Sequence, residues 1–405
     1  MRKRLIFIML RCTLGKVIGQ RCRKIDKSLL ACCMELMHHY LHYPLYLAVL
    51  ANLLSQCQTL QTLSASAPAL SYVTASCILT GSHGKDLHSS LVGQERRGGI
   101  MKLYRSTMFV PGNRPDWIDK APKYGPDALM LDLEDAVPIA EKVTARQIVR
   151  TGIERLRGRG VGVFVRLNGV DTGLTGEDVE AVVTEGLDAV AVPKLEKIEE
   201  VLKVDAWLEL FEHKAGLRIG STEIMVLPET ARGIMDSYKL ATACPRVGNL
   251  IGGVGARSGD VTKAIGYKWT RQGLETLYLA SHILLAARAA GIEYPIGGGS
   301  LEVGDIELVR SQIQRGREVG FRGCLLIHPS AVPIANEIFS PSPEEIEWNK
   351  GIMQAMADAE KAGKAAVTYD GMMIDYAHVR NALELLQQAE SFGIEVGEYA
   401  DVKAL

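Results

Sequence analysis

The sequence predicts an α/β fold, a (β/α)₈ TIM barrel that is preceded by an irregular basic leader and followed by a C-terminal helical extension. Short apolar segments of strand length recur eight times between residue 101 and about residue 335, and helix-like segments lie between most of them. Apolar strands that alternate with amphipathic helices indicate a parallel sheet covered on its outer face, and eight such units indicate a barrel. A doubly wound open sheet is the alternative.

The eight expected strands are continuous apolar runs that end next to charged or polar residues. They are Ser106–Pro111, Ala128–Asp132, Gly162–Leu167, Ala189–Pro193, Glu223–Leu227, Asn249–Gly253, a weak one near Tyr294–Ile296, and Cys324–His328. The expected helices between them have amphipathic spacing and are Pro138–Leu156, Leu195–Phe211, Arg232–Thr242, Thr270–Ala290 and Asp305–Val319.

Charge divides the chain into unlike parts. The 405 residues carry a formal net charge of −1, but residues 1–100 hold 12 Lys and Arg against 4 Asp and Glu, a net of +8, which leaves −9 for the rest. We expect 1–100 to be an irregular or disordered leader foreign to the native protein, 101–340 the catalytic barrel, and 341–405 the helical extension and lid. The near-neutral total and the acidic barrel argue against nucleic-acid binding.

The leader shows no membrane span. Its longest apolar run, residues 44–54, is shorter than the roughly 20 residues that cross a bilayer. Its Arg- and Ser-rich, acid-poor composition is also found in organellar transit peptides. The expected location is therefore the cytoplasm, or the mitochondrion if the leader is a genuine transit peptide, and no membrane partner is expected.

Charged residues follow several of the expected strands at the end where barrel enzymes hold their chemistry. Asp132 and Glu134 follow the second strand, Arg166 the third, Glu229 the fifth and Asp260 the sixth. A single acid in such a place is more often a helix N-cap or a solvated loop residue. Five charged residues at one end of a barrel favour a shared site.

The residue types at this end suit a metal and an oxo acid. Glu229 and Asp260 offer two carboxylates and leave positions for water and substrate oxygens, as Mg²⁺ prefers. Arg166 offers a planar fork for a carboxylate, and a metal beside a keto oxygen can stabilise an enolate. Asp132 and Glu134 alternate onto one side of their strand, where they would hold metal-bound waters or orient Arg166.

Lys194, after the fourth strand, has the residue type of a Schiff-base nucleophile. Such lysines are activated by desolvation or by cationic neighbours, whereas a lysine beside many acids keeps its charge. We therefore expect no Schiff base at Lys194.

Seven segments together carry a resemblance to a known family. They are Arg105–Gly112, Leu131–Val137, Val165–Asn168, Pro193–Lys194, Glu229–Gly233, Gly259–Asp260 with Gly266, and Gly323–Pro329. In this order they resemble the HpcH/HpaI aldolase and citrate lyase β-subunit superfamily, in its citrate lyase β-like and malyl-CoA or citramalyl-CoA lyase branch. The resemblance implies a Mg²⁺-dependent TIM barrel, a homo-trimer or homo-hexamer, that makes or cleaves 3-hydroxyacyl thioesters by Claisen-type chemistry.

The resemblance also implies roles for single residues. Glu229 and Asp260 match the metal ligands, and Arg166 matches the arginine that grips the oxo acid. Asp132 and Glu134 match acids that support these groups. The resemblance also implies that Arg105 and Glu229, like Arg166, contact the substrate. Two departures leave the size and charge of the substrate open: Arg257 stands where relatives carry a small residue, and segment 296–305 lacks an earlier Asp.

The tail favours a thioester substrate. A helical segment from Glu344 to about Ala365 precedes Gly371-Met-Met-Ile-Asp375, which looks like the lid of CoA-ester lyases. There the matching aspartate, Asp375 here, reaches a neighbouring subunit's site and handles a proton on the thioester's α-carbon. The superfamily's pyruvate aldolases lack this lid and carry a His where Asp135 stands. Asp375 is also a candidate helix N-cap before Tyr376–Ala389, and the two roles are compatible.

The expected activity is that of a Mg²⁺-dependent carbon–carbon lyase that cleaves or forms a malyl-CoA, citramalyl-CoA or citryl type of thioester through a metal-stabilised enolate. Its partners are a small-molecule acyl-CoA and a 2-oxo acid. The alternatives are a metal-dependent aldolase of 4-hydroxy-2-oxo acids, a citrate lyase β subunit acting on an acyl-carrier-protein thioester, and a barrel without enzymatic activity.

A truncated chain that starts at Met101 should fold and keep its activity, because the strand pattern and all candidate residues lie after this point. Circular dichroism and turnover of the truncated and full chains, measured side by side, check this. Loss of activity on truncation would show that the leader contributes to the enzyme.

Overall fold

The computed structural model describes residues 103–252 and 257–402. The expectations for the leader, residues 1–100, lie outside the described residues. Within the described part, no helix is both long enough and apolar enough to cross a membrane.

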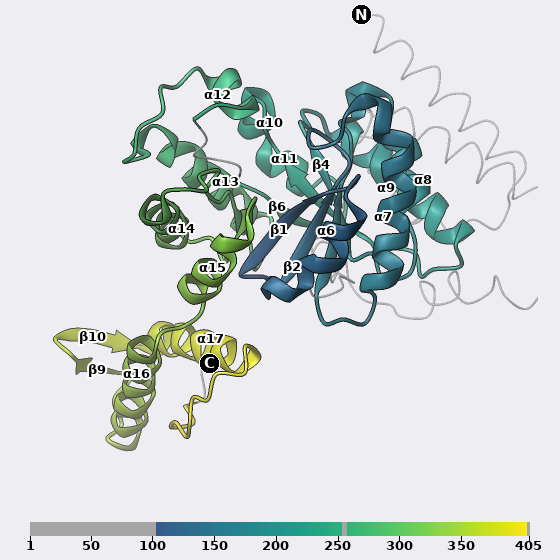
Figure 1. Cartoon of the computed structure of the whole chain (residues 1–405). Coiled ribbons are helices and arrows are strands. Elements are labelled where there is room, and N and C mark those ends of the chain that lie inside the picture. The colour runs from purple at the N-terminus through teal and green to yellow at the C-terminus, as the bar shows by residue number, and fades with distance from the viewer. Residues whose placement is uncertain (1–102, 253–256, 403–405) are drawn as a thin grey trace, which may run out of the picture. The chain divides into compact units, whose positions relative to one another are not determined.

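Eight parallel strands form one sheet that closes into the predicted barrel (Figure 1). They are β1 Ser106–Pro111, β2 Ala128–Asp132, β3 Gly162–Arg166, β4 Ala189–Pro193, β5 Glu223–Leu227, β6 Val247–Leu250, β7 Ile296–Gly297 and β8 Gly323–Leu326. Neighbours in the sheet follow the chain, in the order β6-β5-β4-β3-β2-β1-β8-β7, and a parallel bridge from Gly252 to Gly297 joins β6 to β7. This order excludes the doubly wound sheet.

Four strands have the predicted bounds, and four differ. The third strand ends at Arg166 rather than Leu167, and the sixth runs from Val247 to Leu250, so that Gly252 keeps only a bridge. The seventh is shortened to two residues, and the eighth stops at Leu326, which leaves His328 in the loop beyond it.

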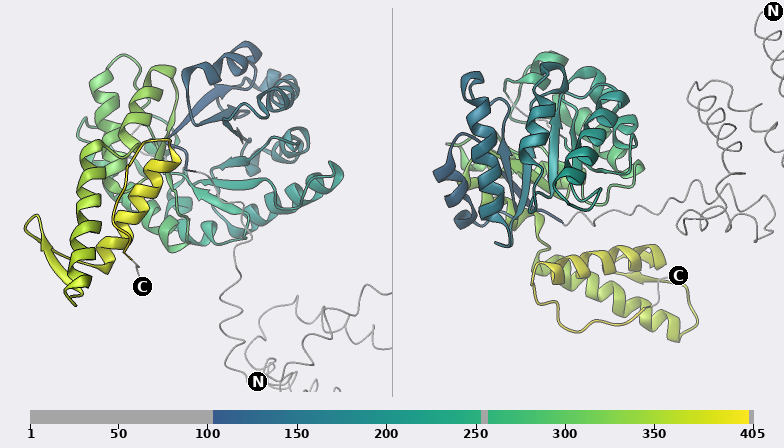
Figure 2. Two further views of the ribbon diagram at one scale, coloured as in Figure 1. Left: turned by 90° about the horizontal axis from the view of Figure 1, so that it is seen from below. Right: turned by 90° about the vertical axis from the view of Figure 1, so that its right-hand side faces the viewer.

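Helices surround the strands on the outside of the barrel (Figure 2). They are α6 Pro115–Lys120, α7 Lys142–Leu156, α8 Thr175–Val182, α9 Ile198–Lys214, α10 Ala231–Met235, α11 Ser237–Ala241, α12 Asp260–Ile265, α13 Leu277–Ala289, α14 Ile306–Val319 and α15 Val332–Phe339, with 3₁₀ turns η1 Ala121–Tyr124 and η2 Ile139–Glu141 among the connections. The helix predicted at Arg232–Thr242 is divided into α10 and α11, because Asp236 between them has φ −95° and ψ 13°.

The core has two layers because successive residues of a strand face opposite sides. On β2, Leu129 and Leu131 pack outward against the helices, whereas Ala128 and Met130 pack inward with Phe164 of β3 and other inward residues. This alternation places Asp132, the next inward position of β2, at the C-terminal end of the barrel interior. The same alternation on β3 places Arg166 there, two residues after Phe164.

The C-terminal residues form helices and a hairpin with a hydrophobic core of their own. The elements are α16 Pro343–Lys361, β9 Ala366–Tyr369, β10 Met372–Asp375 and α17 Tyr376–Ser391. The hairpin was not predicted. Its turn has positive φ at Asp370 (46°) and Gly371 (75°), a conformation that Asp-Gly adopts readily in two-residue hairpin turns.

This extension contacts the barrel at the end where the strands begin. The Arg322 guanidinium, just before β8, pairs with Glu384 of α17 at 2.6 Å, and that of Arg105, just before β1, lies 4.2 Å from the centroid of the Phe392 ring. The N-terminal ends of parallel strands share one face of a barrel, so α17 is held opposite to the strand ends that carry Asp132 and Arg166.

Candidate active site at the strand ends

An ion pair between neighbouring strands forms the centre of the site. The register of β2 and β3 places Asp132 beside Arg166. The Arg166 guanidinium donates from Nε to Asp132 Oδ1 at 2.8 Å and from Nη2 to Asp132 Oδ2 at 2.6 Å, and it lies 4.8 Å from the Phe109 ring centroid. Asp132 is buried, so both carboxylate oxygens hold the arginine in one orientation.

Glu134 extends this pair into a network. The Glu134 and Ala136 backbone N–H groups donate to the two Asp132 oxygens at 2.9 and 3.2 Å, which turns the chain back over the strand end. Glu134 Oε2 lies 2.9 Å from Arg166 Nη1, an ion pair outside hydrogen-bond geometry. Asp132 and Glu134 together therefore fix the guanidinium, and its remaining N–H groups can bind a substrate carboxylate.

Lys194 joins this network to the loop after β6. Its backbone has a positive φ of 58°, a strained conformation for a residue other than glycine. Its Nζ lies 2.8 Å from Glu134 Oε1, 3.0 Å from Asp260 Oδ2 and 3.6 Å from Asp135 Oδ2. Burial alone would lower the pKa of Lys194, but hydrogen bonds to Glu134 and Asp260 raise it above its ordinary value. The lysine stays charged, which supports the expectation of no Schiff base.

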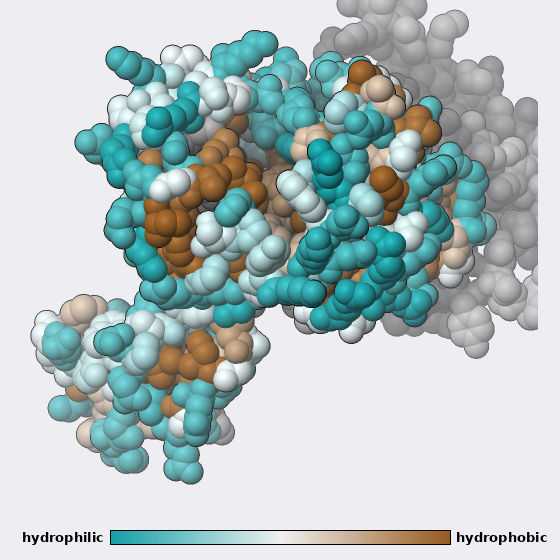
Figure 3. Space-filling model, viewed as in Figure 1, coloured by the Kyte–Doolittle hydropathy of each residue, from teal (hydrophilic) through white to brown (hydrophobic). Residues whose placement is uncertain are grey.

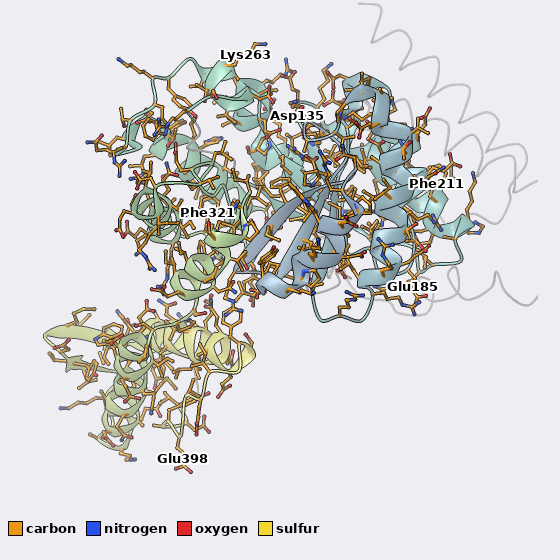
Figure 4. The ribbon with its side chains drawn as sticks, in the orientation of Figure 1. Asp135, Glu185, Phe211, Lys263, Phe321 and Glu398 are labelled. Carbon is orange, nitrogen blue, oxygen red and sulfur yellow. The ribbon has the colours of Figure 1, made fainter. Side chains whose placement is uncertain are left out.

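Asp135 lies at the rim of the site. Its side chain is exposed but lines the same cavity as Asp132 and is near Lys194. In Figure 4, Asp135 and Lys263 of α12 lie toward one end of the barrel, and Glu185, just before β4, lies toward the other.

Glu229 and Asp260, the expected metal ligands, both line the cavity that contains Asp132 and Arg166. Glu229 Oε2 is buried and has no hydrogen-bond partner in the described structure. Burial raises the pKa of Glu229 to about 7, with Glu134 and Asp260 adding to the rise and Arg166 and Lys194 opposing it. A buried carboxylate oxygen without a partner is suited to a cation.

The donor set fits Mg²⁺ better than zinc. In the described residues, no group of three or more His, Cys, Asp and Glu side chains is arranged to hold a metal ion. Zinc sites usually take three or four such ligands, whereas Mg²⁺ is held by one or two carboxylates with water and substrate oxygens. Glu229 and Asp260 with open cavity space match the second pattern.

The cavity has a volume of about 760 Å³. It extends from the strand ends to α6 and η1, where Trp117, Lys120 and Tyr124 line it, and to the loop after β8, where His328 lines it. This volume lies within the range of small-molecule sites, and it exceeds what a small oxo acid alone would fill.

Two predicted residues lie away from this cavity. Arg105 is at the opposite end of the barrel, where its guanidinium binds Asp127 at 2.8 and 2.9 Å and Ser340 at 3.0 Å. Arg105 precedes β1 and therefore lies at the end of the barrel where the strands begin, away from the cavity of its own chain. A contact between Arg105 and substrate stays a prediction. Asp375 is in the C-terminal extension, where its Oδ1 accepts a hydrogen bond from the Ala377 N–H at 2.9 Å and so caps α17.

Arg257 directly precedes Ser258, which lines the cavity. Its Nε pairs with Glu302 at 2.7 Å, and its guanidinium lies 4.4 Å from the Trp269 ring centroid. Because Glu302 precedes α14 and follows β7, this ion pair ties the loops after β6 and β7 together. Arg257 and the segment 296–305 both differ from the family pattern, and the ion pair of Arg257 with Glu302 joins these two differences.

Lys142 was not among the predicted site residues. It is buried at the start of α7, and its Nζ donates to the Leu133 and Glu134 carbonyls at 2.7 Å each. A lysine at the start of a helix usually points to solvent, and backbone acceptors leave no pattern in a sequence, so no signal separated Lys142 from surface lysines.

Comparisons with known proteins match the part of the chain that contains the barrel. The model of the family described as HpcH/HpaI aldolase/citrate lyase matches residues 105–329. The citrate lyase subunit beta of Haemophilus influenzae is 32% identical over 294 residues, which are 72% of this chain and 98% of that protein. A (3S)-malyl-CoA thioesterase of Cereibacter sphaeroides is 33% identical over 290 residues, 71% of this chain and 95% of that protein.

A solved structure is similar over the same region. CitE from Mycobacterium tuberculosis, in complex with magnesium, acetoacetate and coenzyme A, superposes with a TM-score of 0.56 at 26% identity. The match covers 73% of this chain and 99% of that one.

In the metal-free protein, we expect the Glu229 carboxyl to lose its proton near pH 7, about two to three pH units above an ordinary glutamate. The sign follows from burial and from the neighbouring acids, which both disfavour the charged form. Carbon NMR of glutamate-labelled protein, with Glu229→Gln to assign the signal, measures the titration. A midpoint near 4 would show that water reaches this carboxyl freely.

Proposed function

The chain belongs to the HpcH/HpaI aldolase/citrate lyase family, and we propose that it is a Mg²⁺-dependent carbon–carbon lyase that cleaves or forms a 3-hydroxyacyl-CoA thioester. The observation that carries this proposal is the juxtaposition, in one cavity, of the Arg166 fork held by Asp132 and the unpartnered Glu229 carboxylate. The malyl-CoA, citramalyl-CoA and citryl types are the candidate substrates.

Arg166 binds the carboxylate of the oxo acid in this proposal. Asp132 takes Nε and one Nη2 hydrogen, and Glu134 faces Nη1, so the guanidinium cannot rotate away when the substrate enters. The bound carboxylate then directs the keto group of the oxo acid toward Glu229 and Asp260. Fixing the two reactants in this way lowers the entropic part of the barrier.

Glu229 and Asp260 would hold Mg²⁺, which supplies Lewis acidity toward the oxo-acid oxygen when it is bound. Lys194 bonds to Asp260 and Glu134 and so limits the repulsion among the acids. The magnesium in the CitE complex of M. tuberculosis supports this assignment.

Asp375 is proposed as the group that moves the proton. In the condensation direction it takes a proton from the thioester's α-carbon, and the resulting carbanion electrons form the bond to the keto carbon. The π electrons of the keto group move to its oxygen, which takes a proton from water to become the hydroxyl; cleavage reverses these events and returns the proton to the α-carbon. Its contacts with the Ala377 N–H and with His378 Nδ1 both use Oδ1, and its side chain also accepts a hydrogen bond from the His378 backbone N–H. Hydrogen bonds from His378 and Ala377 lower the pKa of Asp375.

A second copy of the chain would supply this aspartate. The extension is tied to the barrel at the strand beginnings through Arg322 and Glu384 and through Arg105 and Phe392, and the cavity is at the strand ends. The exposed Met373 beside it, 70% accessible, presents an apolar surface next to Asp375. The proposed homo-trimer or homo-hexamer would place this hairpin at a neighbour's cavity.

Exposed apolar side chains elsewhere support an oligomer. Apolar surface gathers around α13 and α14 in Figure 3. Leu277, Leu285 and Ile306 in these helices are 41%, 70% and 43% accessible. Exposed apolar side chains that gather in one patch are typical of a surface that binds another protein chain.

The proposed lyase should release acetyl-CoA together with glyoxylate from malyl-CoA, or together with pyruvate from citramalyl-CoA. EDTA should abolish this activity, and Glu229→Gln should lower it by about 100-fold or more, because a ligand of the charge-stabilising group is lost. Chromatography of the CoA products measures both effects.

Several results would contradict this activity. Free CoA with malate would indicate thioester hydrolysis, as in the name of the C. sphaeroides relative. Turnover of 4-hydroxy-2-oxo acids without turnover of CoA esters would indicate the aldolase, and dependence on a co-purified acyl-carrier protein would indicate a citrate lyase β subunit. Activity indifferent to both EDTA and Glu229→Gln would refute the metal-dependent mechanism.

Two inactive variants should complement each other if Asp375 acts in a neighbour's site. Asp375→Ala and Glu229→Gln, co-expressed in equal amounts, form mixed oligomers in which about a quarter of the sites combine an intact Glu229 with an intact Asp375 of the adjacent copy. The mixture should show roughly that share of wild-type activity, whereas each variant alone stays inactive. A mixture no more active than its parts would place Asp375 in its own chain's site or outside catalysis.

A further inference from the structure

We propose that Lys142 and Arg146, one turn apart on α7, are positioning residues that hold the loops after β2 and β3 and through them the Asp132, Glu134 and Arg166 network. This inference rests on the proposed function, because it concerns how the oxo-acid site keeps its geometry. Neither side chain lines the cavity, so both act through other residues.

Lys142 fixes the backbone on both sides of Glu134. Its Nζ is buried and donates to the Leu133 carbonyl and to the Glu134 carbonyl at 2.7 Å each. These carbonyls belong to the peptide units before and after the Glu134 Cα, so their directions set the direction of the Glu134 side chain. That side chain in turn contacts Arg166 and Lys194.

Arg146 does the same for the end of β3 through a buried acid. Its Nε donates to Asp178 Oδ1 at 2.7 Å, and Asp178 Oδ2 accepts from both the backbone N–H and the Nδ2 of Asn168, at 2.8 and 2.7 Å. Asn168 is two residues after Arg166. Asp178 is fully buried, so Arg146 is the cation that balances its charge.

One helix face therefore braces both halves of the central ion pair. Lys142 and Arg146 are four positions apart, which places them side by side on α7. The Leu133 N–H also donates to the Arg166 carbonyl at 2.9 Å and links the two braced segments. Apolar residues would fill these buried positions at lower cost in desolvation, but they could not bind the carbonyls that orient Glu134.

The test is the condensation of acetyl-CoA with pyruvate or glyoxylate by Lys142→Met. We expect the KM for the oxo acid to rise by about tenfold or more, and the KM for acetyl-CoA to stay within about twofold, since Lys142 acts only on the side of the cavity that binds the oxo acid. Lys142→Arg should recover part of the loss, because it restores a cation that donates to carbonyls.

A double-mutant comparison separates positioning from a merely structural role. In an Arg166→Lys background, Lys142→Met should raise the oxo-acid KM much less than in the wild type, because the two residues act through one network. The matched control is Arg150→Met on the same helix, which removes a hydrogen bond to the Ala181 carbonyl at 3.0 Å away from the site. It should leave both KM values unchanged.

An unchanged oxo-acid KM in Lys142→Met, with only thermal stability reduced, would overturn the proposal. If Lys142→Met does not fold, Arg146→Lys replaces it in the test, because it keeps the positive charge beside Asp178 but loses the planar guanidinium. The KM values of this variant for the oxo acid and for acetyl-CoA then decide whether the positioning role holds. Calorimetric titration with pyruvate in the presence of Mg²⁺ distinguishes a failure of the positioning role from a failure of the proposed function. If the wild type and Lys142→Met bind pyruvate with the same affinity, the positioning role alone is refuted. If the wild type neither binds pyruvate nor catalyses the condensation, the proposed function and this inference are refuted together.

Discussion

The bidentate ion pair between Asp132 and Arg166 is the interaction on which the rest of the site depends. It exists because β2 and β3 pair in a register that places the two residues side by side at the last inward position of each strand. A shift of one residue would turn one of them toward the helices and leave a buried charge without a partner, which costs several kcal/mol. Sheet register and site chemistry are therefore fixed by the same contacts.

Charge balance explains how so many acids can share one end of the barrel. Asp132, Glu134, Asp135 and Asp260 all lie near Arg166 or Lys194, and these two cations carry most of the compensation. Glu229 is the acid left with an unsatisfied oxygen, and burial raises its pKa to about 7. The acids are thus divided between those that orient a cation of the protein and Glu229, which has a buried oxygen open to an added partner.

The sequence predicts the barrel and the central cluster because both leave local patterns. Strands such as Ala128–Asp132 are buried along their whole length and read as continuous apolar runs, and charged residues directly after them belong to the strand-end face. Arg105 directly precedes the predicted strand Ser106–Pro111, so its place at the end where the strands begin could be read from the sequence, and only the resemblance assigned it to the substrate. Lys142 was missed because its acceptors are backbone carbonyls. The β9–β10 hairpin did leave a signal, the Asp370-Gly371 pair between alternating residues, which helix-like surroundings obscured.

The closure between β6 and β7 differs from the other strand pairs. Gly252 and Gly297 meet in a single bridge, and a side chain on either would press against the Phe321 ring, with contacts of 2.6 and 3.0 Å from an added Cβ. By contrast β1 and β2 are in register over five residue pairs. Local opening follows the number of backbone hydrogen bonds that must break, so amide hydrogens along this junction should exchange with solvent sooner than those of β1 to β5. The barrel should thus open locally between β6 and β7, beside the loop that carries Asp260, while the strands that hold the Asp132–Arg166 ion pair stay paired.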